Sequence, residues 1–107
     1  MALAEKKCVP CEGGVMPLTI QEAETLMKEL VGWKLTEGAR KIEKSVTFKN
    51  FAEALAFANA VGAIAESENH HPDLQVKWGS VRVELSTHAI GGLSENDFIL
   101  AAKIDKI

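Results

Sequence analysis

Three histidines carry most of the side-chain chemistry in this sequence, and two of them are adjacent. His70 and His71 come directly before Pro72, and His88 follows further along the chain. Imidazole can donate or accept a proton near neutral pH, which suits general acid and base catalysis. Because a proline disfavours helical geometry in the residue before it, we expect a helix to end within residues 69–71. Two proton-transfer groups should therefore lie at one helix end.

A carboxylate lies close enough in the sequence to assist the first of these histidines. Glu66 precedes His70 by one helical turn, so the two side chains share a face if the helix continues through both. We expect Glu66 to hold the His70 imidazolium or to fix its tautomer, and the helix dipole also favours the charged ring. His88 follows Thr87 at the expected end of a strand, where site residues are common.

Zinc coordination is the rival chemistry for three histidines. Adjacent helical residues point about 100° apart, and the sequence contains no HExxH arrangement, so we expect no metal. Cys8 and Cys11 form a single CxxC without a second cysteine pair or a strand–helix–strand pattern around it. A metal or redox role for these cysteines is the weaker alternative, and two cysteines exclude a disulfide framework.

The composition is that of a small soluble globular domain. The 107 residues are 47% hydrophobic and 25% charged, with a net charge of −3. The negative balance argues against direct nucleic-acid binding through a basic surface. The longest uncharged run, residues 54–65, is too short to span a membrane, and the first residues lack an apolar secretory core. We therefore expect a cytoplasmic protein without membrane contact.

Three expected helix starts share one pattern, a capping side chain followed three positions later by an acid. The cap oxygen accepts a hydrogen bond from a free amide, and the acid lies at the positive end of the helix dipole. The pairs are Thr19 with Glu22, Asn50 with Glu53, and Ser94 with Asp97. Helices are thus expected to begin directly after each capping residue, and Asp97 is interpreted first as a structural capping residue. The middle helix, from Phe51 into the 60s, is apolar almost all round, which is typical of a buried or subunit-sharing helix.

Alternating apolar residues between these helices indicate two hairpins, over residues 33–48 and 74–86. The order α-β-β-α-β-β-α predicts an α+β, two-layer domain in which three helices cover one face of a four-stranded antiparallel sheet. Residues 1–18 mix charge, glycine and proline without a period. We expect them to form an irregular N-terminal arm, and residues 19–107 to form the domain.

The histidine region resembles the signature of the pterin-4a-carbinolamine dehydratases. That signature joins an acid, a His-His-Pro sequence, an aromatic residue, a further histidine and an aspartate. The matching residues here are Glu66, His70, His71, Pro72, Trp78, His88 and Asp97. The resemblance covers about residues 19–107. The sequence departs from some family members at Asn69, where they have an aspartate, so the position lacks a charge that could act on the imidazoles.

The resemblance implies dehydration of a 4a-hydroxytetrahydropterin to quinonoid dihydropterin and water, in tetrahydrobiopterin recycling. No metal or organic cofactor is implied, because the pterin is the substrate. His70, His71 and His88 would be the catalytic residues, with His70 and His88 as acids and His71 as base or binder. The implied substrate-binding residues are Glu66, Asn69, Pro72, Trp78, Ser86 and Thr87.

The resemblance also implies partners and leaves alternatives open. Family members form homodimers and homotetramers and are linked to aromatic amino-acid hydroxylases. Some animal members bind a homeodomain transcription factor. The rival functions are a non-catalytic pterin-binding or dimerisation module and a related role in molybdopterin-cofactor metabolism. An intact set of three histidines favours the enzyme, because a scaffold has no need of them.

Overall fold

A computed structural model describes residues 2–9, 16–36 and 38–107. In chain order the elements are η1 (Leu3–Glu5), α1 (Ile20–Met27), β1 (Lys34–Thr36), β2 (Lys41–Thr47), α2 (Phe51–Glu68), β3 (Asp73–Lys77), β4 (Ser80–Leu85), η2 (His88–Ile90) and α3 (Glu95–Ile104). This order confirms the predicted α+β arrangement. None of the helices in these residues is long and apolar enough to cross a membrane.

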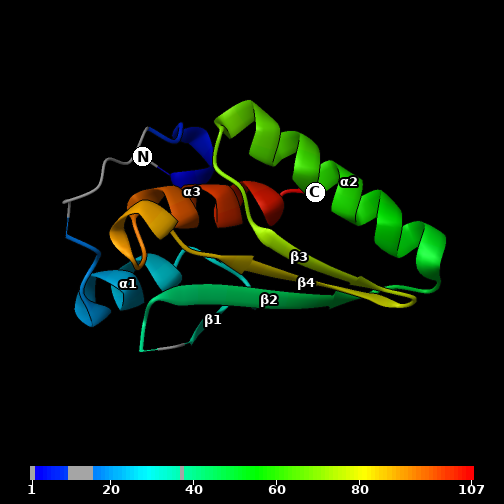
Figure 1. The fold of residues 1–107 in the computed structure, drawn as a ribbon, viewed down its shortest axis with the longest axis horizontal. Coiled ribbons are helices and arrows are strands. Elements are labelled where there is room, and N and C mark those ends of the chain that lie inside the picture. Colours follow the sequence, from blue (N-terminus) through cyan, green and yellow to red (C-terminus); the bar gives the residue numbers. More distant parts are fainter. Residues whose placement is uncertain (1, 10–15, 37) are drawn as a thin grey trace.

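The four strands form one antiparallel sheet in the order β1-β2-β4-β3. In Figure 1, α2 and α3 lie along one face of this sheet. The alternating valines of β4 point to that face, and Val81 and Val83 are fully buried. Opposite residues of an antiparallel pair share a face, so the register that sets Ile42 of β2 against Leu85 of β4 places both in the same core.

Helix α2 is only partly buried, although its sequence is apolar almost all round. Ala54, Ala58, Val61 and Ala65 face the core, whereas Phe51 and Leu55 are 46% and 43% exposed. The alternative of a deeply buried helix is therefore wrong. An exposed apolar helix face is compatible with contact between subunits, and self-association through it stays a prediction.

One inward-facing charge is neutralised where α3 ends. Lys44 of β2 lies opposite Val83 and shares its core-facing side. Its ammonium donates to Asp105 Oδ1 at 2.8 Å, and the indole N–H of Trp33 donates to the same oxygen at 2.9 Å. The backbone amide of Val31 donates to Asp105 Oδ2 at 3.0 Å. Asp105 therefore ties the end of α3 to the α1–β1 connection and to β2.

We predict that Asp105→Ala lowers the free energy of unfolding by about 2–4 kcal/mol, because it leaves three donors and the Lys44 charge without their acceptor. Urea denaturation measures the change. The matched control is Glu95→Ala on the same helix, which removes an exposed ion pair with Lys6 and one acid from the first turn of α3 and should cost less than about 1 kcal/mol. Equal effects of the two substitutions would contradict the account.

Candidate active site

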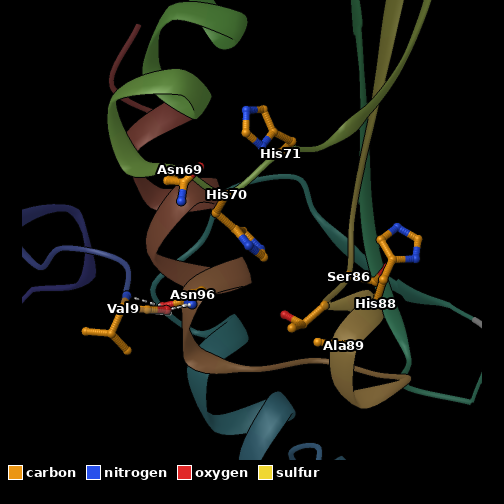
Figure 2. Close-up of a pocket in the computed structure, with 9 residues that line it drawn as sticks. Val9, Asn69, His70, His71, Ser86, His88, Ala89 and Asn96 are labelled. Carbon is orange, nitrogen blue, oxygen red and sulfur yellow. Dashed lines mark hydrogen bonds between the residues drawn. The ribbon is translucent and has the colours of Figure 1, made fainter. Parts of the chain in front are cut away.

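A pocket of about 380 Å³ opens between the end of α2, the turn after β4 and the start of α3. All three histidines line it. Figure 2 shows His70 directed inward from the end of α2, His71 at the same helix end with its ring turned away from His70, and His88 on the turn after β4. The remaining lining residues are Val9, Asn69, Ser86, Thr87, Ala89 and Asn96.

The end of α2 explains how two adjacent histidines take different directions. Asn69 adopts left-handed geometry, with φ of 52° and ψ of 39°, which asparagine tolerates better than most residues. The His70 amide then donates to Ala65 O at 3.2 Å and the Asn69 amide to Glu66 O at 3.3 Å, the pattern of a Schellman motif. The chain therefore leaves the helix at Asn69, as the following proline predicted.

The expected pairing of Glu66 with His70 is wrong. Glu66 instead forms a short hydrogen bond with Nε2 of His71, and both side chains are exposed, at 77% and 54%. The physical reason is the left-handed Asn69, which takes His70 out of helical register, so that the two residues no longer share a helix face. His71 reaches back to Glu66 in its place.

His70 is held by a buried carboxylate on α3. Nε2 of His70 lies 2.6 Å from Asp97 Oδ1, and the two side chains are 12% and 0% exposed. Asp97 Oδ2 accepts from the Thr87 hydroxyl at 2.8 Å and from the Ser94 amide at 3.0 Å. The Ser94 bond confirms the capping interaction predicted for Asp97. Its contact with His70 is the additional role that sequence reasoning missed.

His88 is presented by a tight loop. The Thr87 amide donates to Gly92 O at 2.7 Å, and the Gly92 amide to Thr87 O at 3.4 Å, which closes residues 88–91 into a turn. Gly91 ends η2 with φ of 67°, a region that glycine enters without strain. His88 thus begins η2, three residues beyond the last residue of the strand that it was expected to end. Its ring is exposed at the pocket edge.

The pocket includes most, but not all, of the predicted site residues. Asn69, Ser86 and Thr87 line it with the histidines, whereas Glu66, Pro72 and Trp78 are not among its lining residues. Trp78, expected in the core or in a pocket wall, is 69% exposed in the β3–β4 turn. Trp78 continues the alternation of apolar residues in the sequence, but β3 ends at Lys77 and Trp78 lies in the hairpin turn. Its substrate-binding role stays a prediction.

Val9, Ala89 and Asn96 are lining residues that the sequence did not single out. Val9 belongs to the arm, which carries no periodic signal that could have placed it. Asn96 lies in the first turn of α3, two residues after the capping residue Ser94. A polar side chain at this position was the only sequence feature that could have suggested a role for it. Its buried side-chain amide forms hydrogen bonds with the backbone of Val9.

Cys8 lies against the same two helices and is poorly suited to thiolate chemistry. Its backbone amide donates to Glu68 Oε1 at 2.8 Å, and its thiol to Asn96 O at 3.6 Å. Burial, followed by the negative charge of Glu68, raises the pKa of the Cys8 thiol to about 12. Cys11, the other half of the predicted CxxC, lies outside the described residues. Within the described residues, no group of three or more His, Cys, Asp or Glu side chains could hold a metal ion.

The fold and pocket define a small α+β protein with a histidine site at the junction of two helices and a strand. Residues 16–107 match the family described as pterin 4 alpha carbinolamine dehydratase. The chain therefore belongs to the pterin-4a-carbinolamine dehydratase family, as its sequence resemblance predicted.

Relatives match over nearly their whole length. A Methylococcus capsulatus protein named "Putative pterin-4-alpha-carbinolamine dehydratase" is 50% identical over 99% of this chain and 93% of its own. A Rickettsia canadensis protein of the same name is 54% identical over 96% and 94%.

Two solved structures share the fold. A transcriptional coactivator/pterin dehydratase from Brucella melitensis superposes with a TM-score of 0.79 at 32% identity, over 84% of this chain and 96% of that one. A pterin dehydratase-like protein described as a RuBisCO assembly factor in the alpha-carboxysome has a TM-score of 0.61 at 23% identity, over 71% and 88%. The second likeness concerns the fold alone.

We predict that Cys8 of the folded protein resists iodoacetamide at pH 9–10, where an ordinary thiol is largely ionised. The raised pKa keeps the proton on sulfur through this range, and the thiolate is the reactive form. The measurement is peptide mass spectrometry on a Cys11→Ser variant, with the urea-unfolded chain as the reactive control. Equal alkylation rates in the folded and unfolded chains would contradict the burial of this thiol.

Proposed function

We propose that the chain dehydrates a 4a-hydroxytetrahydropterin to quinonoid dihydropterin and water by histidine acid and base catalysis. The observation that carries this proposal is the His70–Asp97 contact inside a pocket that His71 and His88 also line. The reaction breaks the C4a–O bond and removes the proton of the neighbouring ring nitrogen. It therefore needs one group that delivers a proton to the departing hydroxyl and one that accepts the ring proton.

His70 is suited to the role of acid. The buried Asp97 carboxylate fixes the orientation of the ring and compensates its charge when both nitrogens carry protons. Nε2 is engaged by Asp97, so Nδ1 is the nitrogen that can serve the substrate. His88 lies across the pocket (Figure 2) and is assigned as the second acid, toward the other face of the pterin ring.

His71 is suited to the role of base. Its Nε2 is bonded to Glu66, which leaves Nδ1 to accept the ring proton. Both partners are more than half exposed, so the proton can pass on to water. This exposure distinguishes the two pairs: the His70–Asp97 pair is largely closed to solvent, whereas the His71–Glu66 pair is open to it.

No cofactor takes part in this scheme, because the pterin is the substrate and the bond changes are proton transfers with loss of water. We place the activity in tetrahydropterin recycling in the cytoplasm, downstream of an aromatic amino-acid hydroxylase that supplies the carbinolamine. The family membership supports this proposal, as does the family resemblance of the whole histidine set.

We predict that His70→Ala and His88→Ala each lower kcat about 100-fold or more, since a positioned acid contributes about 10²–10⁴-fold. His71→Ala should cost less, because water reaches this exposed position. The assay follows quinonoid dihydropterin formation from synthetic carbinolamine, corrected for the spontaneous reaction. Lys77→Ala, at an exposed position outside the pocket, is the control for substitution itself.

Two outcomes would reject the enzyme. One is a wild-type chain that gives no acceleration over the spontaneous rate, and the other is full activity in folded His70→Ala and His88→Ala variants. Binding of a reduced pterin without turnover would favour the non-catalytic binding module. Unchanged turnover in excess chelator is expected for a reaction that uses no metal.

A further inference from the structure

A second hollow, of about 150 Å³, adjoins the candidate active site. The two spaces share Ser86, Thr87 and His88 as lining residues, so a molecule held against His88 can extend from one space into the other. Figure 2 shows the active-site side of this junction at Ser86 and His88. The second hollow adds two cations, Arg40 and Lys41, which do not line the active site.

The register of the sheet brings these two cations beside the active site. Strands β2 and β4 are antiparallel, with Ile42 opposite Leu85. The residues that come before Ile42 therefore lie beside the residues that follow Leu85. As a result, Arg40 and Lys41 lie next to the segment that carries His88, although about half the chain separates them in sequence.

The hollow presents positive charge in a protein whose net charge is −3. None of the described residues that line it is acidic. Lys41 pairs with Glu84 at 3.7 Å, whereas the Arg40 guanidinium forms no hydrogen bond or ion pair with the described residues, and neither does the Ser86 hydroxyl. These groups are donors that an oxyanion can engage, and a concave site lined by one sign of charge attracts the opposite sign.

We propose that this hollow binds an anionic group, a phosphate or a carboxylate, on the side chain of the pterin substrate, and that Arg40 recognises it. The inference rests on the proposed function. The side chain of a reduced pterin is attached next to the reacting ring nitrogen, so it leaves the active site near the proton-transfer histidines. A side chain that passes His88 enters the hollow directly, because the two spaces share that residue.

Arginine suits this role better than a general attraction between charges would require. Its guanidinium binds phosphate and carboxylate through two parallel hydrogen bonds, and it keeps its charge at every working pH. A neutral hydroxyl on the side chain gains no comparable charge attraction. The substrate class is therefore a reduced pterin with an acidic side chain, and Arg40 is the residue that distinguishes it from a neutral pterin.

The test compares three synthetic carbinolamines that differ only in the side chain: a hydroxymethyl group, its phosphate monoester and a carboxymethyl group. At low ionic strength, kcat/KM of the wild-type chain should be about tenfold higher for the ester than for the hydroxymethyl substrate, the effect of one charge-assisted hydrogen bond. The carboxymethyl substrate should fall between them, because a carboxylate carries less charge than a phosphate. Added salt should reduce the advantage, since Arg40 is exposed.

Substitutions at Arg40 identify the residue responsible. Arg40→Gln should bring the kcat/KM ratio of the ester to the hydroxymethyl substrate close to one, and Arg40→Lys should retain part of the preference, because the charge stays and the fork is lost. The loss should appear in KM for the ester, since contact with a non-reacting group stabilises ground state and transition state alike. The matched control is Lys77→Gln, which removes the same charge from an exposed position beside the start of β4 and should leave the ratio unchanged.

Binding is also measured without turnover, with inorganic phosphate as the probe. Gly91 and Gly92 line the hollow, so their amide signals in nuclear magnetic resonance spectra should shift as phosphate is added to the wild-type chain. The same titration of Arg40→Gln should give no such shifts. Shifts in the wild type without a preference for the anionic substrates would show a site for free phosphate only, and would overturn the proposal.

The remaining outcomes separate this inference from the function on which it rests. A wild-type chain inactive on all three carbinolamines would reject the dehydratase, and this inference with it. An active chain with equal kcat/KM for the three substrates would reject the anion-binding role and leave the dehydratase standing. Equal ratios in Arg40→Gln and Lys77→Gln would reject Arg40 as the residue that recognises the side chain.

Discussion

The Asp97 carboxylate, fully buried and bonded on both oxygens, is the interaction on which the rest of the site depends. Burying a charge is costly unless hydrogen bonds replace the lost water. Here they come from the Ser94 amide at the start of α3, the Thr87 hydroxyl after β4, and His70 after α2. One side chain therefore fixes where three elements meet, and it orients a histidine in the pocket at the same time. Structural capping and site chemistry are two consequences of the same carboxylate.

Helix α3 repeats this device at its other end. Asp105 accepts hydrogen bonds from Val31, Trp33 and Lys44. Asp97 accepts its hydrogen bonds in the same way at the pocket end of the helix. A domain of this size buries a modest core, so two multiply bonded carboxylates on one helix contribute strongly to its placement. The arm adds a third set of contacts through Lys103 and Asn96. Residues of α3 thus form hydrogen bonds with three segments that line the pocket, at His70, Thr87 and Val9.

The sequence predicted the elements well, because the signals for them are local. The capping pairs at Thr19 and Asn50 form the expected bonds to Glu22 and Glu53, and the proline at position 72 predicted the end of α2. The partner of His70 could not be predicted in the same way. It depends on the left-handed turn at Asn69 and on an aspartate from a distant helix, and neither contact has a periodic signature.

Two further differences have the same origin. Alternation alone extended β3 through Trp78, although the hairpin turn leaves that side chain in solvent. The N-terminal arm has no periodic pattern of apolar residues. The sequence therefore could not predict that Leu3 packs in the core or that Val9 bonds to Asn96. The three histidines, in contrast, were identified correctly as neighbours, because their family signature records the convergence that local patterns omit.

The most direct test of this account is the turnover of Asp97→Asn, measured on folded protein beside Glu66→Gln. An asparagine keeps the volume of Asp97 but not the negative charge that lies against the His70 ring. The account predicts a fall in kcat of about 100-fold for Asp97→Asn, with reduced-pterin binding within about threefold of wild type, and a much smaller fall for the exposed Glu66→Gln. Wild-type kcat in a folded Asp97→Asn variant would contradict the claim that the buried carboxylate supports catalysis through His70.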